Sequence, residues 1–299
     1  MRATGTLITA AVTLITPFAS LPAQSRPTVN AAFVVSTDWL ADHRRDPNLV
    51  LIHVVDDSAY RKDHIPGSRS VWYRDFVMKR GLVSTELPSV EHLKAVMERL
   101  GISNRSHVVV YGVESPMATR FLFTLDYLGH DRMSFLDGGM TQWKAEGRAV
   151  TTEAVRPGVS SFMPRPREEL VASADWITER TKRPGLALID TRTDEEYLGT
   201  GGRSGMPSVG HLAGARQLQW EQLFRDSSAT VLRSVAELQQ LYSERVGDGK
   251  DVVTYCWVGY RGSATYFVAR YLGYTTRLYD GSYQDWSQRN LPVRSGAAP

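Results

Sequence analysis

The 299-residue chain contains a single cysteine, Cys256. A disulfide within the chain is therefore excluded, and a structural zinc site, which is usually built on several cysteines, is not expected. The histidines and carboxylates show no metal-ligand spacing either. We predict a protein without a bound metal, in which Cys256 is free for chemistry or for pairing with another molecule.

The chain also lacks a strong charge of one sign. Its formal net charge is +3 and its pI is about 8.9. The lysines and arginines are scattered, and no basic run is interleaved with aromatic residues, so we expect no nucleic-acid binding. Small anionic substrates are the simpler partners for such a chain.

No apolar run is long enough to cross a membrane as a mature helix. The apolar stretch from about Leu7 to Phe18 follows Arg2 and precedes Leu21-Pro22-Ala23. This order is typical of a secretory signal peptide. We predict a signal peptide over residues 1–23, cleaved after Ala23, with an uncleaved interfacial anchor as the alternative. The mature protein is then expected in a bacterial periplasm or outside the cell, without stable membrane association.

Cys256 lies in a strand–loop–helix pattern. The β-branched run Val252–Tyr255 ends at Cys256, a short loop follows, and Ser263–Gly273 is predicted as a helix. A lone cysteine is more often a small buried apolar residue than a nucleophile. Here the strand end, the following helix N-terminus and Arg261 in the same loop all favour the thiolate, so we predict that Cys256 is reactive.

The chain also contains an internal repeat, and its length and 42% apolar content suit two domains. Apolar β-rich runs alternate with amphipathic helices, which indicates α/β domains with parallel sheets flanked by helices. Matching segments include Ser36–Leu40 with Ser173–Ile177, Leu49–His53 with Leu186–Asp190, and Leu136–Gly139 with Tyr279–Ser282. We predict domains over residues 30–148 and 173–294, joined by a proline-containing linker over 149–172.

The two copies differ at the position of the cysteine. When His107–Tyr111 is laid on Asp251–Tyr255, the residue opposite Cys256 is Gly112. The first copy therefore has no nucleophile, and we expect one reactive site per chain.

The loop Cys-Trp-Val-Gly-Tyr-Arg, following Val-Val-Thr-Tyr, resembles the active-site loop of rhodanese-type sulfurtransferases, and the repeat resembles their tandem-domain members. The resemblance implies two rhodanese-like domains, the first catalytically silent. It also implies a persulfide on Cys256 as the intermediate, with no other cofactor. Tyrosine-phosphatase-type enzymes place five residues between cysteine and arginine. Here four separate Cys256 from Arg261, which leaves phosphatase or arsenate reductase activity as a weak alternative.

The resemblance also assigns roles within the site. Arg261 is expected to bind an anionic donor, because an arginine at a helix N-terminus calls for a compensating anion. The loop's backbone N–H groups are expected to cradle the transferred sulfur. The predicted substrate-binding residues are therefore Trp257, Val258, Gly259, Tyr260, Arg261 and Gly262.

Outside the loop, Asp190 and Arg192 are expected to support the active site as an ion pair at a strand end. Glu196 departs from the mammalian enzymes, which carry a substrate-gripping arginine at that place, so their specificity does not transfer directly. The segment Gly199–Gly205 lacks the features of a phosphate-binding loop and is expected to be a flexible insertion near the cleft.

The leading hypothesis is a monomeric sulfurtransferase that takes sulfur from thiosulfate and passes it to a thiol or to cyanide. Arg261 favours thiosulfate over 3-mercaptopyruvate, whose enzymes carry small residues and a hydroxyl in the loop. A non-catalytic persulfide carrier, loaded and unloaded by partners, is the alternative from a different functional class.

Overall fold

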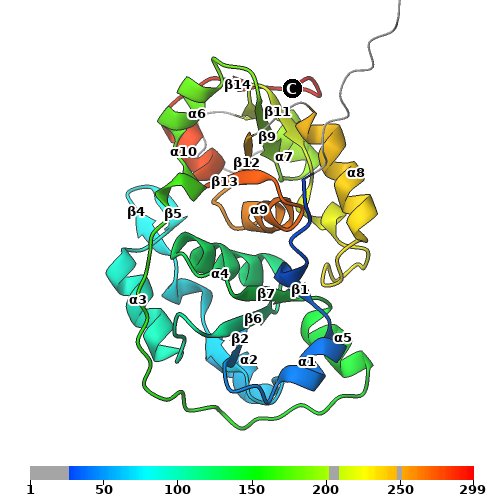
Figure 1. Cartoon of the computed structure of the whole chain (residues 1–299). Helices are drawn as coiled ribbons and strands as arrows, with labels where there is room; N and C mark the ends of the chain where they lie inside the picture. Colours follow the sequence, from blue (N-terminus) through cyan, green and yellow to red (C-terminus); the bar gives the residue numbers. More distant parts are fainter. Residues whose placement is uncertain (1–26, 202–208, 248–250) are drawn as a thin grey trace, which may run out of the picture.

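The computed structural model describes residues 27–201, 209–247 and 251–299, so the predicted signal peptide lies outside the described residues. Across these ranges no helix is long and apolar enough to cross a membrane. The N-terminal half lies at the bottom of Figure 1 and the C-terminal half at the top.

Each half contains one five-stranded parallel sheet, which confirms the predicted α/β fold with two similar domains. The first sheet has the order β1 (Val34–Val35), β7 (Met133–Leu136), β6 (His107–Gly112), β2 (Leu49–Val54) and β3 (Arg69–Val71). The second has the order β11 (Ala215–Gln217), β9 (Leu186–Asp190), β12 (Asp251–Tyr255), β13 (Thr275–Tyr279) and β8 (Val171–Ala172). Read from opposite ends the two orders correspond, so the same fold is present twice.

Helices flank both sheets, and short antiparallel ribbons extend from them. The helices of the N-terminal half are η1 (Ala31–Phe33), α1 (Thr37–His43), α2 (Asp57–Lys62), η2 (Tyr73–Asp75), α3 (Val90–Arg99), α4 (Ser115–Tyr127) and α5 (Gly139–Ala145). Those of the C-terminal half are η3 (Glu168–Leu170), α6 (Ala174–Arg180), α7 (Asp194–Leu198), η4 (Trp220–Leu223), α8 (Val235–Val246), α9 (Gly262–Tyr271) and α10 (Ser282–Gln288). The antiparallel ribbons pair β4 (Met78–Arg80) with β5 (Val83–Glu86), and β10 (His211–Leu212) with β14 (Val293–Arg294).

The repeat extends to the details of hydrogen bonding. Tyr111 and Tyr255 end equivalent central strands, and each hydroxyl accepts a backbone N–H at 3.1 Å, from Ile65 in one half and Leu212 in the other. The helix caps repeat as well. The hydroxyl of Ser36 caps α1 and that of Ser173 caps α6, each accepting the N–H of the residue three positions later, because serine satisfies a free donor of the first turn.

The two halves pack through α4 and α9, which lie side by side at the centre of Figure 1. The hydroxyls of Thr119 and Ser263 are 3.0 Å apart, and the rings of Phe123 and Tyr266 meet edge to face at 5.0 Å. One apolar cluster runs through both halves. The relative position of the two sheets is therefore set by a packed core.

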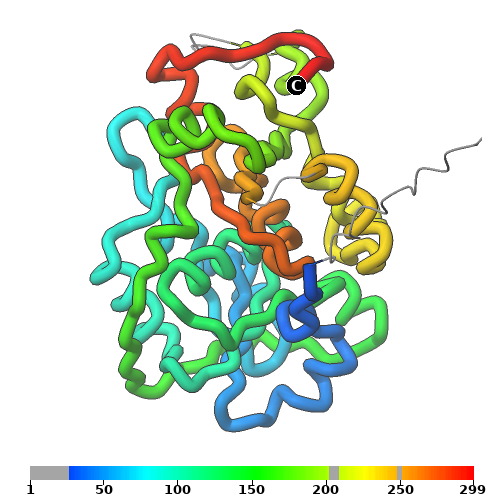
Figure 2. Tube along the Cα trace, turned by 45° about the horizontal axis from the view of Figure 1, so that its top comes forward, coloured from blue at the N-terminus to red at the C-terminus, as the bar shows by residue number. Residues whose placement is uncertain are grey.

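Two connecting segments run between the halves. The start of the described chain lies on the C-terminal half, where the N–H of Asn30 donates to the carbonyl of Tyr271 at 2.8 Å (Figure 2). The predicted linker over 149–172 runs without helix along the N-terminal half as far as Arg167, and is anchored there by Phe162, which is buried. Its last two residues form β8, so the second sheet begins at Val171, within the predicted linker.

Candidate active site

Cys256 directly follows β12, the central strand of the second sheet, and a five-residue loop separates it from the N-terminus of α9. Its side chain is fully buried. The backbone holds it on the first turn of α10: the N–H of Cys256 donates to the Ser282 hydroxyl at 3.3 Å, and its carbonyl accepts from the N–H of Tyr283 at 3.0 Å. The thiol therefore lies where a parallel α/β sheet places its reactive groups, at a strand end facing a helix N-terminus.

The loop after Cys256 curls through a left-handed glycine. Gly259 has φ +77°, and a Cβ there would lie 2.7 Å from the carbonyl oxygen of Asp280 and 3.0 Å from Nη1 of Arg120. Only glycine fits this backbone conformation and this space. The carbonyl of Val258 accepts a hydrogen bond from the Thr85 hydroxyl at 2.5 Å, so the N-terminal half holds the loop from the other side.

Arg261 is paired with Glu196. Its Nη1 lies 2.8 Å from Oε2 of Glu196 and its Nη2 lies 2.9 Å from Oε1, while the side chains are 17% and 14% exposed. The anion that the sequence requires beside Arg261 is thus supplied by the residue that departs from the mammalian pattern. Burial raises the pKa of Glu196, but the hydrogen bond and charge of Arg261 outweigh it, so this pKa lies below its usual range.

Tyr260 reaches the other half of the chain. Its hydroxyl donates to Oε2 of Glu114 at 2.7 Å, and its ring meets Tyr73 edge to face at 5.1 Å. Burial, and then the hydrogen bond to the Glu114 carboxylate, raise the pKa of Tyr260, so the phenol stays protonated. Tyr260 therefore joins the loop to the N-terminal half.

Trp257 and Gly262 lie on the inner side of the loop. Trp257 is 5% exposed and stacks on Tyr283 with ring centroids 5.6 Å apart, in the core of the C-terminal half. A Cβ on Gly262 would lie 3.2 Å from a methyl group of Leu278 and 3.3 Å from the N–H nitrogen of Cys256. These two residues pack the loop against the core of the C-terminal half.

Asp190 and Arg192 form a buried ion pair at the end of β9. Nη2 of Arg192 lies 2.6 Å from Oδ2 of Asp190 and also donates to the carbonyl of Gly210 at 2.6 Å. The guanidinium lies 3.9 Å above the Tyr283 ring. Burial lowers the pKa of Arg192, and the charge of Asp190 more than compensates, so the net shift is upward. Because both side chains are at most 1% exposed, their geometry suits support of the turn.

Sequence reasoning missed Arg120 on α4. Its side chain is fully buried, and Nη1 pairs with Oδ1 of Asp280 at 2.5 Å, directly against Gly259. The available signal was a charged residue directly before the apolar run Phe121–Phe123. A buried charge needs a partner, although the sequence does not show which one.

The N-terminal half has no counterpart of Cys256 and none of the ion pair between Asp190 and Arg192. Gly112 ends β6 where Cys256 follows β12, and α4 begins only three residues later. His53 lies at the position of Asp190: it pairs with Tyr111 as Asp190 pairs with Tyr255. The difference between the two halves therefore extends beyond the missing cysteine.

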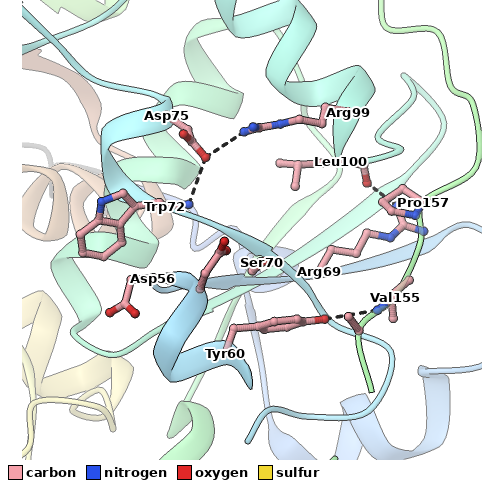
Figure 3. Close-up of a pocket in the computed structure, with 12 residues that line it drawn as sticks. Asp56, Tyr60, Arg69, Ser70, Trp72, Asp75, Arg99, Leu100, Val155 and Pro157 are labelled. Atoms are coloured by element: carbon pink, nitrogen blue, oxygen red, sulfur yellow. Dashed lines mark hydrogen bonds and ion pairs between the residues drawn. The ribbon is translucent and has the colours of Figure 1, made fainter. Parts of the chain in front are cut away.

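Two cavities lie on the N-terminal side of the site. One, of about 680 Å³, lies between the halves and is bordered by Val258 and Tyr260 of the loop and by Tyr73, Thr85 and Glu114, among others. The other, of about 580 Å³, is lined only by residues of the N-terminal half and the linker, among which Asp75 and Arg99 form an ion pair (Figure 3). Only the first cavity adjoins the loop.

Within the described ranges no group of three or more histidine, cysteine, aspartate or glutamate side chains could hold a metal ion. The segment Gly199–Gly205 is described only as far as Gly201; Gly199 ends α7 in the left-handed conformation with φ +76°, and residues 202–205 lie outside the described residues.

The model of the rhodanese-like domain family matches the chain twice, over residues 36–146 and 173–289. The chain belongs to the rhodanese family. Both matches coincide with the two halves of the structure. The sequence-based resemblance and the two rhodanese-like domains are thereby confirmed.

Curated relatives agree at the level of the family. The chain is 33% identical over 280 residues to the sulfur carrier protein TtuD of Thermus thermophilus, covering 88% of this chain and 96% of the relative. It is 30% identical to a thiosulfate sulfurtransferase of Azotobacter vinelandii, covering 83% and 91%. Among solved structures, YnjE shares 25% identity with a TM-score of 0.76, covering 88% of this chain and 68% of that one. The chain is thus a member of a sulfurtransferase family.

Proposed function

We propose that the protein transfers sulfane sulfur from thiosulfate to a thiophilic acceptor through a persulfide on Cys256. The observation that carries the proposal is the position of Cys256 at the end of the central strand, before the N-terminus of α9, with Arg261 in the same loop. A helix N-terminus and a guanidinium both attract an anionic donor to this position.

In the first half-reaction, the Cys256 thiolate attacks the outer sulfur of thiosulfate. A new sulfur–sulfur bond forms, the bond within thiosulfate breaks, and sulfite leaves with the bonding electron pair. The loop's backbone N–H groups support the transferred sulfur, and Arg261 attracts the anionic donor. A guanidinium carries five N–H donors, so Arg261 has donors beyond the two that Glu196 accepts.

In the second half-reaction, the acceptor attacks the outer sulfur of the persulfide and the Cys256 thiolate leaves. Cyanide becomes thiocyanate, and a thiolate becomes a persulfide. The protein needs no further cofactor in this scheme. It would act as a monomer, with one site per chain.

The test is thiocyanate formation from thiosulfate and cyanide, with Cys256→Ser run beside the unchanged protein. Turnover that disappears in the serine variant would support the proposal. Absence of turnover, with Cys256 still labelled by an alkylating reagent, would contradict the thiosulfate reaction and point to 3-mercaptopyruvate, which the same assay tests as donor.

A persulfide carrier is a second candidate, favoured by the similarity to a protein named as a sulfur carrier. A carrier would take up one sulfur per chain from a donor and release it only to a protein partner. One equivalent of persulfide on Cys256 without multiple turnovers with cyanide would favour it.

We also propose that residues 1–23 are removed on export and that the mature chain begins at Gln24. Intact mass measurement of protein recovered from a bacterial periplasmic extract tests this. A chain retaining Met1 would overturn it.

A further inference from the structure

The donor-binding arginine of the site is already occupied. Both Nη atoms of Arg261 donate to Glu196, one to each carboxylate oxygen, in a bidentate pair at 2.8 and 2.9 Å. Such fork-to-fork pairs are among the stronger charge-assisted contacts. The pair is nevertheless 14–17% exposed, so a small anion from solution can reach it.

Glu196 is held in place for this contact by α7. It is the third residue of that helix, and its Oε2 also accepts from the backbone N–H of Thr193 at 3.1 Å, while the Thr193 hydroxyl accepts from the N–H of Glu196. This reciprocal capping box fixes the glutamate at the positive end of the helix. Because the carboxylate belongs to the same chain, it faces Arg261 at a high effective concentration.

We propose that Glu196 determines donor affinity by competing with the anionic donor for Arg261, and that its return to Arg261 helps release the anionic product. This inference rests on the proposed thiosulfate function. A donor that binds Arg261 must first displace Glu196, and sulfite must displace it as well. The competition therefore lowers the affinities for thiosulfate and for sulfite by a common factor.

Glu196→Gln is the variant that isolates this competition. Glutamine keeps the capping box, since either glutamate or glutamine serves at that position, but removes the negative charge that holds Arg261. Binding is measured in a Cys256→Ser background, so that no chemistry intervenes. Thiosulfate and sulfite are each titrated by calorimetry against Cys256→Ser and against the double variant.

We expect both dissociation constants to fall by about the same factor in the double variant, roughly fivefold, the size of one partly exposed ion pair. In the protein that retains Cys256, Glu196→Gln should lower the KM for thiosulfate and make sulfite a stronger product inhibitor. Unchanged or weaker binding would overturn the inference and leave Glu196 as a helix cap.

Glu237→Gln is the matched control. Glu237 is the third residue of α8, caps Ser234 in the same way, and pairs with the exposed Arg233. It should leave both dissociation constants unchanged. Turnover with cyanide, together with equal binding by Cys256→Ser and the double variant, overturns only the competition. Absence of both turnover and thiosulfate binding overturns the proposed function and the competition with it.

Discussion

Arg120 of the N-terminal half and Asp280 of the C-terminal half form a buried ion pair directly against Gly259 of the Cys256 loop. Nη1 of Arg120 lies 2.5 Å from Oδ1 of Asp280, with side chains 0% and 8% exposed. Oδ2 of Asp280 accepts the backbone N–H of Leu87 at 2.7 Å, so the carboxylate is bound by the N-terminal half at both oxygens. Burial lowers the pKa of Arg120, but the charge of Asp280 outweighs it. The N-terminal half therefore positions Gly259 and, through it, the loop of Cys256.

The first prediction concerns this pair. Arg120→Met leaves Asp280 buried without its cation, and we expect the free energy of unfolding to fall by about 3–5 kcal/mol. Turnover should fall as well, because Gly259 loses the group on which it packs. Urea denaturation and the thiocyanate assay measure the two effects.

Two further variants separate a positioning role from general instability. Arg120→Met combined with Asp280→Asn removes the stranded charge and should recover stability while kcat stays low. Lys182→Met breaks an exposed pair with Glu179 and should cost at most about 1 kcal/mol. Full activity and stability in Arg120→Met would contradict the role given to the pair.

The second prediction separates backbone strain from crowding at Gly259. Gly214 has φ +85° with nothing within 4 Å of an added Cβ, whereas a Cβ on Gly259 meets the Asp280 carbonyl at 2.7 Å. Gly214→Ala should cost roughly 1 kcal/mol, for the left-handed backbone alone. Gly259→Ala should cost more and also reduce turnover, because the loop must shift. If thermal denaturation shows equal losses of stability in Gly214→Ala and Gly259→Ala, and Gly259→Ala retains activity, then the loop accommodates the methyl group.

The third prediction is a pH dependence of stability centred on His53. Its side chain is 5% exposed and stacks on Tyr111 at 4.2 Å. Burial, followed by the charge of His64, lowers the pKa of His53 to about 3. The unfolded chain binds a proton near pH 6.5, so the stabilisation is complete above that pH and is lost as the pH falls toward 3, by about 1.4 kcal/mol per unit.

The comparison that isolates this proton is His53→Gln against the unchanged protein, each unfolded in urea at pH 7.5 and pH 5.5. The unchanged protein should lose about 1 kcal/mol more than the variant between the two pH values. Parallel losses in both proteins would assign the acid sensitivity to other groups.

Local patterns predicted much of this molecule. The strand Val252–Tyr255 and the helix Ser263–Gly273 follow from apolar periodicity, and the structure reproduces them to within two residues, as Asp251–Tyr255 and Gly262–Tyr271. The ribbon β10–β14 was not predicted, because it pairs His211 with Arg294, which are remote in sequence. The hairpin β4–β5 is local, but its strands are only three and four residues long and show too short a pattern to predict.

In the candidate site, too, local sequence predicted some features and missed those that depend on remote contacts. Cys256 and its loop could be recognised from adjacent residues, and Glu196 was noticed as a departure from a known pattern. Its pairing with Arg261 spans 65 positions and depends on how α7 packs beside the loop. The partner of Arg120 lies in the other half of the chain. Contacts of this kind form when helices and loops that are distant in sequence pack together, and a local sequence pattern does not predict them.

The packing of α4 against α9 also bears on how this duplicated gene can change over time. A duplicated domain that lacks the reactive cysteine would ordinarily be free to accumulate mutations or to be lost. Here loss of the first copy would take Phe123 from the ring of Tyr266 and Arg120 from Asp280. Selection on the C-terminal half therefore extends to the N-terminal half that packs against it, and substitutions in the N-terminal half should also abolish the protein's function.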